Sequence, residues 1–397
     1  MPDSTLRSKS IRSKRYIPMS EKTDLLILGD ICPVDEKNNS LHDSFNAKYV
    51  QGICNIIKDT DYVIGNLEAP VIATPSPSQK CGPTLHVEPP HLDTLKHIGI
   101  NSLSVANNHI LDHGPKGLKS TLTYLAERGI DVWGYESNEK CNNDVLNVTL
   151  NDTKIAIFAL AEKEFNYESS VETGACLFDP YIHLSRIQKA KHTSDYVIVL
   201  YHGGIEHYVY PSPVLQKKCR AMVEMGADCV LCQHSHCIGS IEQYHDSVIL
   251  YGQGNSIFGY REGNKEWNHG LAVRISPQNK KVNFIPICMT ANGCETVQPD
   301  NSNNLLSKLQ ARTPLTEDKK FITQQWNKFT KGKTALYLAM LMGKNRIFNK
   351  INRLLNNLLL SVLVSKSQLR TILNLIRCDA HREVLISILE QEIDKKK

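Results

Sequence analysis

The sequence predicts an α/β domain followed by an all-helical region. Up to about residue 290, short apolar runs of strand length alternate with amphipathic stretches of helical spacing, a pattern typical of sheets covered by helices. From about Asn301 onwards, apolar residues recur at helical spacing only. Hydrophobic residues make up 41% of the 397 positions, which allows a large core and argues against global disorder.

The α/β part divides into elements in the following order. Strands are predicted at residues 24–30, 61–68, 100–109, 154–160, 195–203 and 227–234, and in the later runs SVILYGQGN, LAVRIS and VNFIPICM. Helices are predicted before Lys58 and in the segments HLDTLKHIG, GPKGLKSTLTYLAERG and SPVLQKKCRAMVEMG. The third of these helices has a proline near its start and a glycine at its end, the usual asymmetry of a helix.

The helical part contains the apolar stretches LLSKLQA, ALYLAMLM, RIFNKINRLLNNLLLSVLV and LRTILNLIRC. We therefore divide the chain into a basic flexible tail at residues 1–22, an α/β domain at 23–295 and a basic helical C-terminal region at 301–397. No internal repeat is evident.

Charge is distributed unevenly along the chain. Lys and Arg outnumber Asp and Glu by four in residues 1–22 and by 11 in residues 301–397, whereas residues 23–300 carry an excess of ten acidic groups. The basic C-terminal region fits an anionic membrane surface, an acidic polymer or nucleic acid. A solvated bundle of amphipathic helices explains the same charges without any partner.

Cysteine content and hydropathy suggest the compartment. The twelve cysteines include no pair of C-x-x-C motifs and no export signal precedes them, so we expect reduced, mostly buried thiols in the cytoplasm. We expect no transmembrane segment, because the longest apolar run, Leu354 to Val364, is short and interrupted by two asparagines. Peripheral contact with the membrane surface stays open.

Polar side chains follow five of the predicted strands at their carboxyl ends. In α/β sheets, ligands gather at this edge. Carboxylate, amide and imidazole groups together suit one or two divalent ions such as Mn²⁺, Zn²⁺ or Fe²⁺, with Mg²⁺ also considered. The residues concerned are Asp30, Asn66, Glu68, Asn108, His109, His202, His234 and His236.

Each residue also has a structural interpretation. His234 and His236 could simply make hydrogen bonds in a loop, Asp30 could sit in a turn, and Asn108 could accept a backbone hydrogen bond. Asn66 could only fix its loop. The cysteines flanking the histidines, Cys232 and Cys237, resemble small packing residues, and a disulfide between them is a further option.

Six spaced motifs occur in one order: GD, NLE, ANNHILDHG, HGGIEHYVYPSP, QHSHCIGSIEQY and YGQGNSIF. In these motifs the chain resembles the CapA family of capsule and poly-γ-glutamate biosynthesis proteins, which is similar to calcineurin-like metallophosphatases. The resemblance covers about residues 24–260. It implies a four-layer α/β/β/α sandwich with mixed sheets.

The resemblance also implies roles for individual residues. Asp30 would bind one metal, Glu68 would bridge two, Asn108 and His202 would bind the second, and His234 and His236 would each bind one. His109 would be a general acid or would stabilise the transition state, and Asp112 would orient either His109 or the loop. The residues expected on the substrate side are Asn66, Glu206, Tyr208, Pro211 and Asn255.

The sequence departs from dinuclear phosphatases at two ligands. Asp30-Ile31-Cys32 stands where Asp-x-His is usual, and Glu68 replaces the bridging aspartate. Either Cys32 completes the site or only one ion binds tightly.

The resemblance implies a metal-dependent hydrolase of a phosphoester or a γ-glutamyl amide in surface-polymer synthesis. The alternative is a non-catalytic binding or assembly subunit of a polymer-synthesis complex, docked through the helical region. A nucleic-acid partner is not expected, because stacking aromatics and base-reading motifs are not evident.

Overall fold

The computed structural model describes residues 24–394, except for residues 36, 38, 42–43, 59, 138–142, 342–345, 356–357 and 364. The basic tail predicted at residues 1–22 lies outside the described residues. The chain forms two compact units, Met1–Thr323 and Gln324–Lys397.

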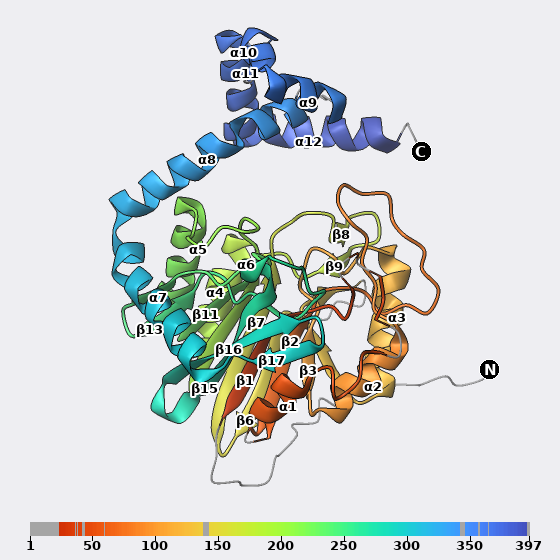
Figure 1. The fold of residues 1–397 in the computed structure, drawn as a ribbon, viewed down its shortest axis with the longest axis vertical. Helices are drawn as coiled ribbons and strands as arrows, with labels where there is room; N and C mark the ends of the chain where they lie inside the picture. The colour runs from red at the N-terminus through yellow and green to blue at the C-terminus, as the bar shows by residue number, and fades with distance from the viewer. Residues whose placement is uncertain are drawn as a thin grey trace, which may run out of the picture. The chain divides into compact units, whose positions relative to one another are not determined.

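The larger sheet of the first unit has eight strands (Figure 1). Its order is β17-β16-β15-β1-β2-β3-β4, with β14 beside β1. The strands are β1 (Leu25–Ile31), β2 (Tyr62–Leu67), β3 (Ser102–Ser104), β4 (Asp131–Trp133), β14 (Asn255–Ile257), β15 (His269–Ser276), β16 (Lys281–Thr290) and β17 (Gly293–Thr296). The sheet is mixed, because β1 pairs in parallel with β2 and β14 but antiparallel with β15.

The second sheet has six strands in the order β12-β13-β11-β10-β7-β6. They are β6 (Val145–Leu150), β7 (Thr153–Ala161), β10 (Tyr196–His202), β11 (Cys229–Gln233), β12 (Ile241–Tyr244) and β13 (Ser247–Leu250). β7, β10, β11 and β13 run parallel, whereas β6 and β12 are antiparallel edge strands. A small third sheet contains β5 (Tyr135–Glu136), β8 (Tyr167–Glu168) and β9 (Thr173–Ala175).

Helices pack on both large sheets. α1 (Gln51–Ile57), α2 (Pro89–His97) and α3 (Gly114–Glu127) accompany the first sheet, and α4 (Pro180–Lys191) and α5 (Pro213–Glu224) contact the second. A short helix α6 (Lys265–Asn268) and a 3-10 turn (Pro277–Asn279) flank β15. The predicted four-layer α/β/β/α arrangement with mixed sheets is therefore confirmed.

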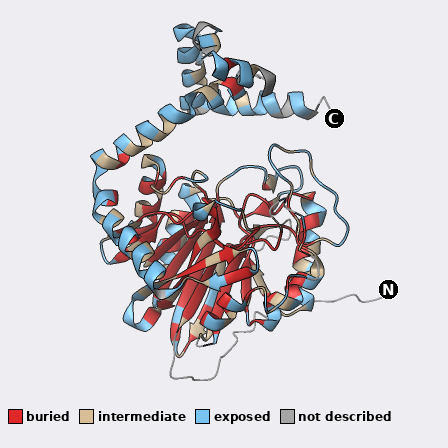
Figure 2. Cartoon of the chain, in the orientation of Figure 1, coloured by how far each residue is buried: buried red, intermediate tan, exposed pale blue. Residues whose placement is uncertain are grey.

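Alternation along β10 shows how the second sheet is buried on both faces. Tyr196, Ile198 and Leu200 belong to the core between the two sheets. Val197 and Val199 point the other way, into a second cluster that includes Leu215 and Met222 of α5. Figure 2 shows the strands of this unit buried, with exposed positions concentrated on the helices and loops.

The chain changes sheets between β13 and β14. The run SVILYGQGN, predicted as one strand, splits here: β13 belongs to the second sheet and β14 pairs with β1 of the first. Gly254 lies in the crossing with φ of 72°, and a Cβ there would lie 2.6 Å from the carbonyl oxygen of His269. Only glycine tolerates both constraints.

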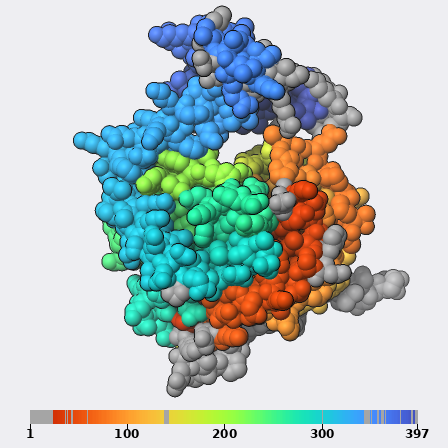
Figure 3. Space-filling model, in the orientation of Figure 1, coloured from red at the N-terminus to blue at the C-terminus, as the bar shows by residue number. Residues whose placement is uncertain are grey.

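Two further differences from the sequence prediction concern element boundaries. The third strand covers only Ser102–Ser104, because the residues after it turn back to form a loop at the sheet edge. Helix α4 and strand β6 were not predicted, although β6 has alternating apolar residues at Leu146, Val148 and Leu150. α1 packs directly on β17, where a Cβ on Gly52 would lie 2.5 Å from the Glu295 backbone; Figure 3 shows these segments of the chain adjoining.

The first helix of the C-terminal part belongs to the α/β unit. α7 (Pro299–Glu317) contacts β12 and β16, and its Leu309 is 2% exposed. The side-chain amide of Gln216 donates a hydrogen bond to the carbonyl oxygen of Thr316 at 2.7 Å. α7 is therefore held by both apolar packing and a buried hydrogen bond.

The remaining helices confirm the predicted all-helical C-terminal region. They are α8 (Lys319–Leu341), α9 (Arg346–Leu354), α10 (Leu358–Leu363), α11 (Lys366–Arg377) and α12 (Asp379–Asp394). Many of their apolar side chains are exposed, including Leu354, Leu358 and Ile393. Over the residues searched, none of the helices combines the length and apolarity needed to cross a bilayer.

The packing of α7 predicts where the chain can be shortened. A chain ending at Thr323 keeps α7, and we expect its α/β unit to unfold at the same urea concentration as in the full chain. A chain ending at Gln298 loses the burial of Leu309, and we expect its free energy of unfolding to fall by about 3 kcal/mol. Fluorescence of Trp133 and Trp267, which both truncations retain, reports the transition. Equal midpoints for the two truncations would contradict this assignment of α7.

Candidate metal centre

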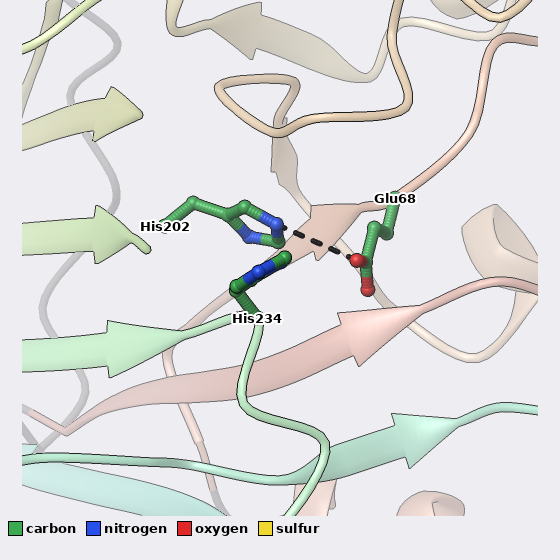
Figure 4. A group of neighbouring side chains, drawn as sticks. All are labelled: Glu68, His202 and His234. Carbon is green, nitrogen blue, oxygen red and sulfur yellow. Dashed lines mark ion pairs between the residues drawn. The ribbon is translucent and has the colours of Figure 1, made fainter. Parts of the chain in front are cut away.

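The carboxyl ends of strands from both large sheets meet at one edge of the first unit. Asp30, the penultimate residue of β1, lies beside Asn66 of β2, and Glu68 follows β2 by one residue. In the second sheet, His202 ends β10, and His234 directly follows β11. Figure 4 shows Glu68, His202 and His234 pointing toward one another from these separate segments.

Two groups of possible ligands share Glu68. Ligand atoms of Glu68, His202 and His234 all lie within 4.8 Å of one another, as do those of Asp30, Glu68 and His236. Oε1 of Glu68 is 3.4 Å from Nε2 of His202 and 3.7 Å from Nε2 of His236. All five side chains are buried. The sequence-predicted ligands thus come together around one carboxylate.

Asn108 adds an oxygen to the group around His202. Its Oδ1 lies 3.0 Å from Nε2 of His202, which is also the nitrogen nearest to Glu68. The six residues predicted as ligands therefore occupy one connected cluster.

The pKa values in the cluster indicate that positive charge does not balance its buried acidic groups. Burial raises the pKa of Glu68 to about 8, and burial together with the Glu68 charge raises the pKa of Asp30 to about 7. Burial also lowers the pKa of His202 and of His234 to about 4, so both imidazoles are neutral at pH 7. Neutral imidazole is the form that binds metal.

Unpartnered polar atoms point to the same conclusion. Three buried atoms lack a hydrogen-bond partner within the described structure. They are both carboxylate oxygens of Glu68 and Nδ1 of His234. Such orphaned atoms are rare and costly unless something occupies the space between them. A divalent cation satisfies carboxylate and imidazole together, so the residues present fit one.

Asn66 and Asn255, expected on the substrate side, contact the predicted ligands directly. The amide of Asn66 donates to Oδ1 of Asp30 at 2.8 Å and lies 3.2 Å from Nδ1 of His202. Asn255 accepts from Nδ1 of His236 at 2.9 Å. Hydrogen bonds of this kind are typical of the residues that orient metal ligands. Asn107, which donates to Oδ1 of Asn66 at 3.1 Å, was missed although it lies inside the ANNH motif.

The H-x-H loop is held in an unfavourable backbone conformation. His234 and His236 have φ of 82° and 49°, and left-handed conformations of this kind cost on the order of 1 kcal/mol in non-glycine residues. The backbone N–H of His234 donates to Oδ2 of Asp30 at 3.0 Å, which ties the loop to β1. The strain turns both imidazoles toward the cluster.

A second polar group borders the cluster. Nδ1 of His109 lies 2.6 Å from Oδ2 of Asp112, which leaves the opposite ring nitrogen, Nε2, outside this contact. Asp112 also accepts hydrogen bonds from the backbone N–H of Leu85, at 2.6 Å, and from Nζ of Lys80. The structure thus brings His109 and Asp112 together as predicted. Lys80 was missed, because the Pro/Ser-rich loop that carries it has no periodic pattern.

A cavity of about 280 Å³ opens beside these groups. Its lining includes Asn108, His109, His236 and Glu206. Tyr208, expected on the substrate side, is not among the lining residues, and its ring lies 6.4 Å from that of Tyr210.

The cysteines take no part in the described ligand groups. Burial raises the pKa of the Cys32 thiol, which disfavours the metal-binding thiolate. Cys232 and Cys237 are both free, and Sγ of Cys232 lies 3.6 Å from Sγ of Cys219. The optional Cys232–Cys237 disulfide is therefore wrong.

The chain matches a protein family over most of the α/β unit. A family model described as "Bacterial capsule synthesis protein PGA_cap" matches residues 24–260. "Capsule biosynthesis protein CapA" of Bacillus anthracis is 29% identical over 256 residues, which are 60% of this chain and 60% of that protein. "PGA biosynthesis protein CapA" of Bacillus subtilis is 31% identical over 214 residues, or 51% and 54% of the two chains. The similarity thus spans less than two thirds of these relatives.

Among solved structures, a 5'-nucleotidase precursor from Thermus thermophilus superposes with a TM-score of 0.41 and 11% identity. The superposition covers 75% of this chain and 60% of that one.

The raised pKa of Glu68 predicts a pH-dependent stability of the metal-free protein. The folded state holds this proton up to about pH 8, whereas the unfolded chain releases it near pH 4.5. The contribution of this group to the free energy of unfolding therefore falls as the pH rises between those values. We expect metal-free Glu68→Gln to exceed the wild type by about 4 kcal/mol at pH 8 and to match it below pH 4.5 in urea unfolding. A difference that does not change with pH would contradict the assigned shift.

Proposed function

The chain belongs to the bacterial capsule synthesis protein family, and we propose that it is a metal-dependent hydrolase acting in the synthesis of a capsule or another surface polymer. The bond cleaved is a phosphoester or a γ-glutamyl amide in an anionic polymer. The observation that carries the proposal is the buried cluster in which Glu68 is shared by two groups of ligands.

Each predicted ligand has a role in this proposal. Asp30, Glu68 and His236 hold one divalent ion, whereas Glu68, Asn108, His202 and His234 hold another. When bound, such ions supply Lewis acidity and lower the pKa of water. Asn66, Asn107 and Asn255 keep the ligands in place.

His109 is the proposed general acid. Asp112 fixes the ring through Nδ1, so Nε2 is available to give its proton to the leaving oxygen or nitrogen of the substrate. Lys80 and the Leu85 backbone hold Asp112 in turn. Glu206, which lines the adjoining cavity, contacts the substrate.

The second candidate is a non-catalytic binding or assembly subunit of a polymer-synthesis complex. The many exposed apolar side chains of the helical C-terminal unit favour this function, since a partner protein could bury them. In both cases the proposed location is the cytoplasm, where the twelve cysteines remain reduced.

Substitution of ligands tests the metal centre. We expect His202→Ala and His234→Ala to lose at least half of the bound Mn²⁺ and nearly all hydrolysis, because each removes a nitrogen from the shared cluster. Elemental analysis of the purified proteins measures the metal, and circular dichroism measures the fold. His192→Ala, at a position outside the cluster after α4, is the control and should keep full metal content. Full metal content in either site variant would show that the assigned ligands are wrong.

Substitution of the acid tests the chemistry separately from the metal. We expect His109→Ala to keep its metal but to hydrolyse an aryl phosphodiester or poly-γ-glutamate about 100-fold more slowly, since proton transfer to the leaving group is lost. Asp112→Asn should lower the rate less, because the ring stays but is held less firmly. A wild-type rate in His109→Ala would rule out this role. Metal-loaded wild type that cleaves neither substrate would favour the assembly subunit.

A further inference from the structure

The cavity beside the metal centre contains a stacked arginine. The guanidinium carbon of Arg261 lies 3.2 Å from the centroid of the Trp267 ring, and Arg261 lines the cavity. Its backbone is fixed by Asn268, whose side-chain oxygen accepts from the Arg261 N–H at 2.9 Å and whose amide donates to the Arg261 carbonyl at 2.7 Å. The guanidinium itself has no hydrogen bond or ion pair within the described part of the chain. Its donors are therefore available for a ligand.

The tryptophan beneath this arginine is also fixed. Nε1 of Trp267 donates to the carbonyl oxygen of Gly259 at 2.7 Å, and the ring packs 5.1 Å from Phe258. A further neighbour is His236, a candidate metal ligand, whose ring centroid is 4.6 Å away. Arg261 is thus held by a rigid stack at a short distance from the metal centre.

The cavity is lined by charges of both signs, and within the described part of the chain the Arg261 guanidinium forms no ion pair with any of them. Lys80, which also lines the cavity, is already paired with Asp112. Two acidic residues, Glu164 and Glu206, also line it, and Oε2 of Glu206 lies 3.9 Å from Nε2 of His207. Burial lowers the pKa of Arg261, and the charge of Glu206 opposes this shift only in part. An anionic group that reaches the Arg261 donors would form the ion pair that this guanidinium lacks among the described residues.

We infer that Arg261 forms an oxyanion subsite that binds a carboxylate or phosphate of the substrate next to the bond being cleaved. The inference rests on the proposed function, because it takes the adjoining metal centre as the place of the reaction. A guanidinium stacked on an indole presents a planar fork of N–H donors, which matches two oxygens of one anionic group. The subsite would select polymers whose repeat units each carry a negative charge.

Calorimetric binding to the Mn²⁺-loaded full chain tests the subsite without requiring turnover. One probe is a γ-glutamyl oligomer with free α-carboxylates, compared with the same oligomer carrying α-carboxamides. The other is a glycerol-phosphate oligomer, compared with its neutral methyl triesters. We expect the wild type to bind one charged probe about 10- to 100-fold more tightly than its neutral form, which identifies the anion.

Variants assign that preference to Arg261. In Arg261→Gln the charged probe should bind at most about 2-fold more tightly than its neutral form. Arg261→Lys keeps the charge but not the planar fork of donors, so its preference for the charged probe should lie between those of the wild type and Arg261→Gln. Lys265→Gln, a nearby loss of charge outside this cavity, should keep the full preference. An undiminished preference in Arg261→Gln overturns the inference, and so does a wild type that shows no preference for either charged probe. Metal content and hydrolysis, measured on the same samples, decide the proposed function independently.

Discussion

The carboxylate of Glu68 is the constraint around which the α/β unit is organised. It is fully buried, it is shared by two groups of possible ligands, and neither of its oxygens has a hydrogen-bond partner among the described residues. A chain gains nothing in stability from such a group, since burying an uncompensated carboxylate costs several kcal/mol. The cluster is therefore understandable as a site prepared for cations, with the stability supplied elsewhere by the cores on both faces of the second sheet.

The fold explains how residues from distant parts of the sequence reach this point. Parallel strands in both sheets end at the same edge, and the crossing from β13 to β14 joins the two sheets there. That crossing delivers Asn255 behind His236, and the segment after it delivers Trp267 and Arg261 beside the cavity. The connection from β13 to β14 and the segment after it thus supply both a residue that contacts a predicted ligand and residues that border the cavity.

Strand ends were the part of the site that sequence could predict. Short apolar runs between helical segments located β1, β2, β10 and β11 to within two residues at each end. The polar residues near the carboxyl ends of these strands converge as expected. Side chains whose position depends on irregular loops could not be found in this way. Lys80 and Arg261 lie in segments without periodicity, and the roles of Asn66 and Asn255 follow from which neighbour each one bonds. The place of α7 was not predictable either, because its contacts with β12 and β16 depend on tertiary packing.

The most direct measurement is anomalous diffraction from crystals of the full chain soaked in Mn²⁺. The account predicts anomalous density between Glu68 and the three histidines, about 2.2 Å from Oε1 or Oε2 of Glu68 and from at least one imidazole nitrogen. Density only at other places on the protein, or none with Mn²⁺ in excess, would contradict the claim that this cluster is a metal centre.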